Sequence, residues 1–231
     1  TSMRAMRRHE IERIGLSWMS GVISDSDSLK AMTDVYDAII DASLTWAVRH
    51  QIAAFGVETA PAGITVIAMG RYGGREVNFS SDADAILIYR PADDADDGQA
   101  NAFAKKVVED LRNILQGPTT LEPKIELDLG LRPEGKDGAL VRVLSSHKNY
   151  YEQWAENWEF QALLKARPVA GDPDLGQAYM DMTRPFVWSA SKRKNFVYDC
   201  QKMRKRVEDL IPAPLKDREI KLGRGGLRDV E

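Results

Sequence analysis

Two aspartates stand one residue apart at the start of an apolar run, in the stretch SSDADAILIY at residues 80–89. If the run is a strand, Asp82 and Asp84 point to the same side of it, because side chains alternate in direction along a strand. Their Cα atoms would lie ~7 Å apart, which lets both carboxylates converge on two cations ~3.5–4 Å apart. Such ion pairs serve phosphoryl and nucleotidyl transfer, and oxygen ligands favour magnesium or manganese over zinc.

Two neighbouring features favour a cation site over the alternative that the two aspartates are only the polar edge of a strand. The apolar run ITVIAM at residues 64–69 ends in GRYGG, and a glycine turn lets backbone N–H groups approach a phosphate closely. The later stretch IELDL offers Glu126 and Asp128 on one face of a strand that could lie beside the first two acids. A third carboxylate would complete a two-metal site.

The elements that must position these acids follow from hydrophobic spacing and turn residues. Strands followed only by helices predict an α+β catalytic part at residues 1–145, which includes N-terminal helices, and a helical part at 146–231. The expected helices are 25–52, 100–117 (with Gly117 as C-cap and Pro118 beyond it), 146–166 and 190–211, and the expected strands are 64–69, 83–90, 123–129 and 139–144.

Composition narrows the function classes. The chain has 231 residues, of which 43% are hydrophobic and 29% are charged, as in an ordinary globular protein. One cysteine and three scattered histidines argue against an internal disulfide and a zinc enzyme. No run approaches the ~18 apolar residues that cross a bilayer, and the start shows no signal-peptide pattern, so we expect a cytoplasmic protein without a membrane partner.

Charge is distributed unevenly along the chain. Residues 192–231 hold 12 basic and 7 acidic side chains, although the whole chain has a net charge of −3. A solvated helix face explains this most simply, and a docking surface for an anionic ligand is the alternative. Nucleic-acid binding, which would give salt-sensitive affinity, is not expected.

Taken together, the strand, the glycine turn, the D-x-D pair and the third acid resemble the polymerase-beta-type nucleotidyltransferase superfamily. Arg71 stands where that superfamily commonly has serine, which points to a particular branch. Four segments, in order, resemble the glutamine synthetase adenylyltransferase/adenylyl-removing enzyme family from about residue 10 onward. They are MGRYGGREVNFSSDAD, LDLGLRPEGKDGALV, YYEQWAENWEFQALLKARPVAGD and IKLGRGGLRDVE.

The resemblance implies a nucleotidyltransferase fold, meaning a small mixed sheet with flanking helices, followed by a helical region. It implies that Asp82, Asp84 and Asp128 are catalytic and hold two Mg²⁺ ions, with Mn²⁺ as a substitute. One half of such enzymes transfers AMP from ATP to a tyrosine of glutamine synthetase, and the other removes it with phosphate to give ADP. The motifs leave open which half this is, and the length suggests part of one half.

The resemblance also implies partners and phosphate ligands. Glutamine synthetase would be the protein substrate, a PII-type signal protein would be the regulator, and the process would be the regulation of nitrogen assimilation. Arg132 could instead pair with the acids, and Lys165 could simply be exposed. Trp158, Phe160 and Leu163 are expected to be core rather than an adenine platform. The predicted nucleotide- or phosphate-binding residues are Gly70, Arg71, Gly73, Ser81, Arg132, Lys165 and Arg167, with Arg75 and Glu159 as weaker candidates.

Two other functions compete with this hypothesis. A dinucleotide site is disfavoured, because GRYGG lacks the G-x-G-x-x-G spacing and leads to D-x-D rather than to a helix. A non-catalytic module that binds nucleotide or a partner protein remains the main alternative.

Overall fold

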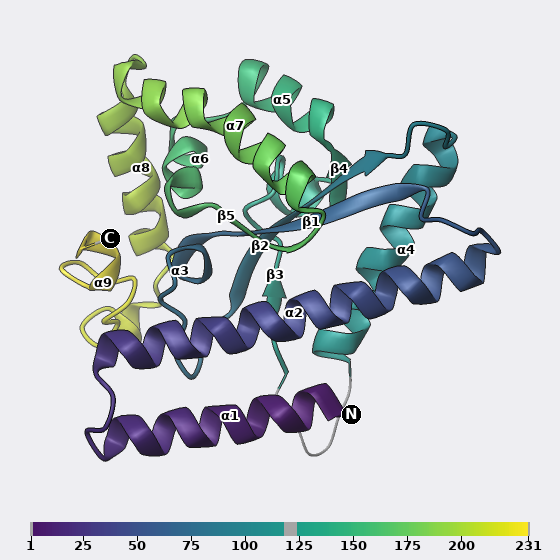
Figure 1. The fold of residues 1–231 in the computed structure, drawn as a ribbon. Helices are drawn as coiled ribbons and strands as arrows, with labels where there is room; N and C mark the ends of the chain where they lie inside the picture. The colour runs from purple at the N-terminus through teal and green to yellow at the C-terminus, as the bar shows by residue number, and fades with distance from the viewer. Residues whose placement is uncertain (1, 118–123, 231) are drawn as a thin grey trace.

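In residues 2–117 and 124–230, which the computed structural model describes, a five-stranded mixed sheet lies between helices on both faces (Figure 1). The strand order is β3-β2-β1-β5, and β4 pairs with β2 off this path. The strands are β1 (Ala62–Ala68), β2 (Ala83–Pro91), β3 (Leu127–Asp128), β4 (Val141–Val143) and β5 (Arg167–Gly171).

Helices supply most of the described chain. Short 3-10 turns at Gly135–Asp137, Leu163–Lys165, Ala190–Lys192 and Ala213–Leu215 connect the longer elements. The α-helices are α1 (Ser2–Met19), α2 (Asp25–Phe55), α3 (Gly70–Gly73), α4 (Asp97–Gln116), α5 (Leu144–Gln153), α6 (Asn157–Ala162), α7 (Pro173–Ser189), α8 (Phe196–Asp209) and α9 (Leu227–Val230).

The central strands are buried on both faces, and their alternating side chains build two separate hydrophobic clusters. Val66 of β1 and Leu87 of β2 belong to the cluster that includes residues of α2 and α4. Ile67 and Ile86 point the other way, into the cluster formed with α5, α6 and α7. This period of two explains why β1 and β2 read as continuous apolar runs.

Helix α2 begins and ends where the sequence provides capping residues. The Ser24 side chain accepts a hydrogen bond from the backbone N–H of Asp27, which satisfies one of the unpaired donors of the first turn. At the other end Gly56 adopts φ 64°, a left-handed conformation that glycine tolerates without steric cost. The caps delimit a helix of 31 residues, whose Asp37 forms an ion pair with Arg167 of β5.

The predicted α+β class is confirmed, and the strands expected at 64–69, 83–90 and 139–144 are present with small shifts of their ends. The strand expected at 123–129 is reduced to β3; residue 123 lies outside the described residues, as does Pro118. Gly117 caps α4 as expected, since its N–H donates to the carbonyl of Asn113.

The prediction that strands end by residue 144 is wrong. β5 pairs antiparallel with β1, with a register shift between Val66 and Ile67. Its sequence, RPVAG, has no alternating pattern, so only pairing with β1 identifies it as a strand. Helix α7 follows it and lies in the part of the chain expected to be helical, although no individual helix was placed at these residues. The proposed boundary at residues 145–146 stays a prediction.

The strand directions also bear on the competing dinucleotide site. β1 and β2 are antiparallel, whereas β2 is parallel to both β3 and β4. A doubly wound dinucleotide-binding fold requires a mostly parallel sheet with right-handed crossovers. The mixed sheet therefore does not support that alternative.

A buried histidine on α5 should make the stability of the fold depend on pH. His147 is 1% exposed, and within the described residues neither ring nitrogen has a hydrogen-bond partner. Burial, assisted by the charge of Arg142, lowers the pKa of His147 to about 3. An unfolded histidine has its ordinary pKa near 6.5, so the unfolded state takes up the proton first as the pH falls.

We expect this histidine alone to cost about 2 kcal/mol of unfolding free energy between pH 7 and pH 5. Urea unfolding at the two pH values measures the loss, and His147→Phe should remove it. His9→Gln, at an exposed histidine, is the matched control and should keep the full loss. Equal losses in the wild type and in His147→Phe would contradict the prediction.

Candidate active site

The start of β2 brings two of the predicted acids together. In the parallel pairing of β2 with β3, Ala83 lies opposite Leu127 and Asp84 lies opposite Asp128. Residues in register on neighbouring strands share a face of the sheet, so the two carboxylates extend to the same side. Asp82 lies just before the first residue of β2. The third acid is therefore adjacent to the D-x-D pair, as the sequence predicts.

The electrostatics of Asp84 reflect this crowding. The pKa of Asp84 is raised from its ordinary 3.8 to about 6, mainly by burial and in addition by the neighbouring charges of Asp128 and Asp82. The positive charges of Lys221 and Arg228 act in the opposite direction. Three carboxylates that repel one another at the edge of a sheet can bind a cation or a strongly positive group.

Gly70 permits this arrangement. It follows β1, begins α3 and adopts φ 51°. A Cβ atom placed on it would lie 2.7 Å from Oδ2 of Asp84, closer than real Cβ contacts come. A glycine is thus required both by the backbone conformation and by the carboxylate beside it. Gly70, a predicted phosphate-binding residue, therefore lies directly beside Asp84.

The donor set fits a hard divalent cation, because all three groups are carboxylates and Asp82 and Asp128 are exposed. In the described residues, however, no three histidine, cysteine, aspartate or glutamate side chains are already arranged so as to hold a metal ion. The assignment of Asp82, Asp84 and Asp128 as metal ligands stays a prediction. Asp128 Oδ1 meanwhile accepts a hydrogen bond of 2.7 Å from the backbone N–H of Gly130.

Three of the predicted phosphate ligands are used inside the protein. Arg132 donates to the carbonyls of Leu129, Lys136 and Gly138 at 2.7–2.9 Å, and so holds its own loop in shape. Its predicted pairing with the acids is not observed. Lys165 Nζ pairs with Glu76 at 2.8 Å.

Arg167 forms a two-pronged ion pair with Asp37 of α2, at 2.8 and 3.1 Å. Its guanidinium also lies over the ring of Tyr72, and Nε donates to the carbonyl of Gly73. Gly73 is buried where an added Cβ would lie 2.0 Å from the carbonyl oxygen of Lys165, so it serves close packing. Arg167 thus links β5 to α2, and Gly73 allows α3 to pack closely against the backbone at Lys165.

The remaining candidates differ in how they are engaged. The hydroxyl of Ser81 donates to Asn78 at 2.9 Å and accepts from its backbone N–H, which fixes the turn that leads into Asp82. Arg75, a weaker candidate, pairs with Asp34 on α2. Arg71 follows Gly70 directly, and in the described part of the chain it has no ion pair.

Two variants separate these roles. Arg167→Ala leaves Asp37 partly buried without its partner, so we expect it to lower the free energy of unfolding by roughly 2–3 kcal/mol. Arg71→Ala should change stability by less than about 0.5 kcal/mol and should instead weaken phosphate binding. Urea unfolding and nucleotide titration of both proteins measure the contrast. A stability loss of similar size in both would contradict it.

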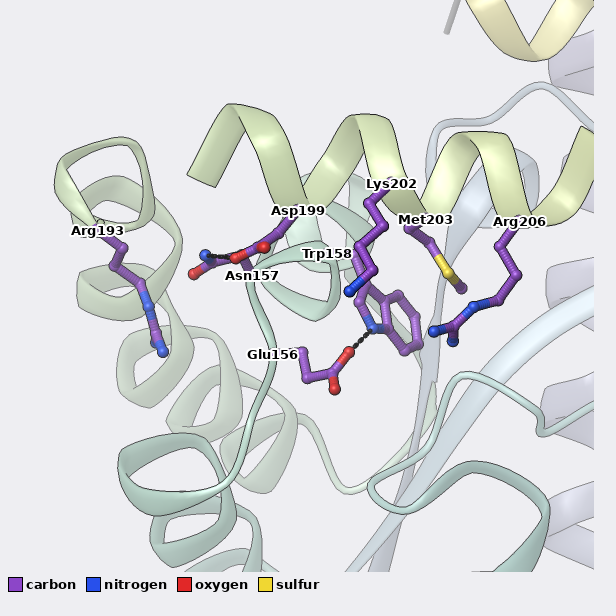
Figure 2. A pocket seen from close by; sticks show the side chains of 8 residues that line it. All are labelled: Glu156, Asn157, Trp158, Arg193, Asp199, Lys202, Met203 and Arg206. Carbon is purple, nitrogen blue, oxygen red and sulfur yellow. Dashed lines mark hydrogen bonds between the residues drawn. The ribbon is translucent and has the colours of Figure 1, made fainter. Parts of the chain in front are cut away.

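The segment YYEQWAENWEFQALLKAR forms a separate pocket of about 250 Å³ between α6 and α8 (Figure 2). Phe160 and Leu163 are buried in the core, as expected. Trp158 is only half-buried: its indole N–H donates to Glu156 at 2.9 Å, and it lies beneath Lys202, so the expectation of a core position is wrong. None of the three aspartates lines this pocket.

Glu159 has a structural position. Its carboxylate accepts from the backbone N–H of Glu156 at 2.9 Å and from the hydroxyl of Tyr150 at 3.0 Å. The first contact completes a capping box at the start of α6.

The residues that sequence reasoning missed are Lys221 and Arg228. Both act electrostatically on Asp84, although about 140 positions separate them from it along the chain. Two signals pointed toward them without assigning a role: the basic excess after residue 191 and the segment IKLGRGGLRDVE.

Comparison with known proteins decides the family. The family model described as glutamate-ammonia ligase adenylyltransferase matches residues 1–182, which is more than half of the chain. The chain belongs to this family. The expected resemblance is thereby confirmed.

Curated relatives carry one name, bifunctional glutamine synthetase adenylyltransferase/adenylyl-removing enzyme. The protein from Bifidobacterium longum subsp. infantis is 74% identical over all of this chain and 22% of its own length. Those from Corynebacterium glutamicum and Streptomyces coelicolor are 46% and 44% identical, over 87% and 100% of this chain and 18% and 23% of their own lengths. The chain thus spans about a fifth of these relatives.

No helix in residues 2–117 and 124–230 is both long and apolar enough to cross a membrane.

Proposed function

We propose that this chain carries a metal-dependent nucleotidyltransferase site that moves AMP between ATP or ADP and a tyrosine of glutamine synthetase. The observation that carries the proposal is the register of Asp84 with Asp128, beside Asp82 and beneath Gly70. The names of the relatives support the substrate, because they are bifunctional glutamine synthetase adenylyltransferase/adenylyl-removing enzymes.

In the adenylylating direction, the tyrosine oxygen attacks the α-phosphorus of ATP. The bond from that phosphorus to the bridging oxygen breaks, pyrophosphate leaves, and the phenol proton passes to solvent water. In the removing direction, an oxygen of inorganic phosphate attacks the same phosphorus in the adenylylated tyrosine, and the tyrosine leaves as ADP forms. Both are in-line displacements at one phosphorus, so one set of side chains can serve either direction.

The three carboxylates would hold the cations at the point where phosphate oxygens approach. Bound Mg²⁺ or Mn²⁺ would supply charge neutralisation for the phosphates and would lower the pKa of a phenol that is near 10 when free. Gly70 keeps the space beside Asp84 open. Arg71 is available for a phosphate oxygen, since in the described residues it is not ion-paired.

The resemblance to the family extends the proposal to regulation and to location in the cell. A PII-type signal protein would regulate the enzyme, the setting would be cytoplasmic nitrogen metabolism, and neither nucleic acid nor a membrane would be a partner. The half to which the chain corresponds, adenylylating or removing, is left to experiment.

The decisive test offers the chain both substrates in the presence of Mg²⁺. Unmodified glutamine synthetase is given ATP labelled in the α-phosphate, and adenylylated glutamine synthetase is given inorganic phosphate. Label on the tyrosine identifies the adenylylating half, and ADP release identifies the removing half. Nucleotide binding with neither reaction would favour a non-catalytic module instead and would overturn the proposal.

A further inference from the structure

The loop at residues 219–229 has a defined shape. The N–H of Leu227 donates to the carbonyl of Ile220 at 2.8 Å, and the N–H of Arg228 donates to the carbonyl of Lys221 at 3.0 Å. The carboxylate of Glu219 accepts from the N–H of Lys221 at 2.9 Å. These bonds place Lys221 and Arg228 next to each other, although seven positions separate them.

Arg204 of α8 holds this loop from outside. Its guanidinium donates to the carbonyls of Leu222 and Gly223 at 3.0 and 2.8 Å, and it pairs with Asp229. Only a planar group with several donors can make these contacts at once, so lysine could not replace it. Arg204 thus binds the loop at residues 222–223 and again at residue 229, which ties the two ends of its glycine-containing turn together.

The closed loop carries two positive charges that act on one of the three aspartates. Lys221 and Arg228 are the positive charges that act on Asp84. Figure 1 draws the C-terminal segment at the end of the sheet where α3 lies. In the described ranges of the chain, neither side chain has an ion pair, in contrast to Lys165 and Arg167. Neither lines the cavity of about 480 Å³ that the loop forms on its other side.

A phosphate chain that approaches three carboxylates needs positive groups besides any cation. Lysine supplies a point charge, and arginine supplies a fork that matches two phosphate oxygens. Three other predicted phosphate ligands, Lys165, Arg167 and Arg132, are taken by Glu76, Asp37 and the loop carbonyls around residue 132, whereas Arg71 has no ion pair in the described residues. Lys221 and Arg228 therefore add two further basic groups that are not ion-paired and that act electrostatically on Asp84.

We propose that Lys221 and Arg228 bind phosphoryl oxygens at the site formed by Asp82, Asp84 and Asp128, and that Arg204 is a positioning residue that holds their loop in place. The inference rests on the proposed function and gives it a phosphate-binding element. The phosphoryl group can belong to a nucleotide or to free orthophosphate, and the chemistry of recognition is the same for both.

Calorimetric titration of the chain with MgATP, orthophosphate and adenosine tests the proposal. Lys221→Ala and Arg228→Ala should each weaken MgATP binding about tenfold, because each removes a charged hydrogen bond. Adenosine binding should stay within about twofold, because adenosine has no phosphate. Weaker orthophosphate binding identifies the free ion as a ligand too. Arg224→Ala removes an exposed cation from the same loop and is the matched control.

Arg204→Ala and Arg204→Lys test positioning. Both should weaken MgATP binding but not adenosine binding, and both should speed amide exchange across 219–229 without speeding it in α2. A purely structural role would affect both ligands alike or neither. The inference is overturned if the Lys221→Ala/Arg228→Ala double variant binds MgATP as the wild type does while the wild type transfers AMP. A wild type that neither binds MgATP nor transfers AMP overturns the proposed function as well.

Discussion

Replacing Asp84 with asparagine is expected to abolish AMP transfer in both directions while leaving the chain folded. The amide keeps the shape of the side chain but removes the negative charge that would neutralise and orient cations beside the phosphates. We expect a loss on the order of 1,000-fold, and a similar loss for Asp128→Asn, which lies in register with it. Label transfer to glutamine synthetase, or ADP release from its adenylylated form, measures the effect.

Stability provides the internal control for this prediction. The folded chain holds the proton of Asp84 more tightly than the unfolded chain, because its pKa is raised to about 6. The ionised carboxyl therefore lowers the free energy of unfolding as pH rises from about 4 to 6, by a few kcal/mol at most in the absence of metal. Asp84→Asn should consequently be at least as stable as the wild type at pH 8.

A neighbouring acid supplies the matched variant. Asp93 is exposed in the loop after β2, so Asp93→Asn changes the net charge by the same amount and should keep full activity. An Asp84→Asn protein that transfers AMP at the wild-type rate with Mg²⁺ present would exclude the carboxylate site. A protein that loses activity together with its thermal transition would not distinguish chemistry from folding, which is why Asp128→Asn is measured in parallel.

The acids could be predicted from the sequence because local signals specify them. The apolar runs before Gly70 and after Asp84 identify β1 and β2 by length and β-branched content. Alternation along a strand then fixes the side to which Asp84 points. The two-residue β3 could be expected only because Asp128 stands in a run that alternates, and its true length depends on pairing with β2.

The missed strand shows where local signals end. β5 contains Pro168 and ends in Gly171, residues that are depleted in strands, and it lies at the edge of the sheet, where proline is tolerated. Its antiparallel pairing with β1 joins segments about 100 positions apart. The five residues of β5 contain no pattern from which its pairing with β1 could be predicted.

The basic residues show a similar limit. The motifs that resemble the family placed Arg132 and Arg167 among the phosphate ligands, but their guanidinium groups are bound to loop carbonyls and to Asp37. Lys221 and Arg228 act electrostatically on Asp84, and Arg204 of α8 binds the loop that carries them. Which arginine supports the fold and which one is available depends on tertiary contacts.

Removal of divalent cations should have the second large effect. Chelation by EDTA is expected to stop AMP transfer, and added Mg²⁺ should stabilise the wild type by RT ln(1 + [Mg²⁺]/Kd), or about 2.7 kcal/mol at a hundredfold excess over Kd. Because Asp84 must ionise to bind a cation and its pKa is about 6, affinity should fall as pH drops below 6. Thermal unfolding with and without Mg²⁺ at pH 7.5 and pH 5 measures both effects.

The variants give this last prediction its specificity. Asp84→Asn should show no Mg²⁺-dependent stabilisation at either pH, whereas Asp93→Asn should respond as the wild type does. Cation binding at a carboxylate with a raised pKa also releases a proton, so the calorimetric heat near pH 6 should depend on the ionisation enthalpy of the buffer. Stabilisation by Mg²⁺ that is independent of pH, or equal in Asp84→Asn, would mean that the ions bind elsewhere and that the three carboxylates serve another purpose.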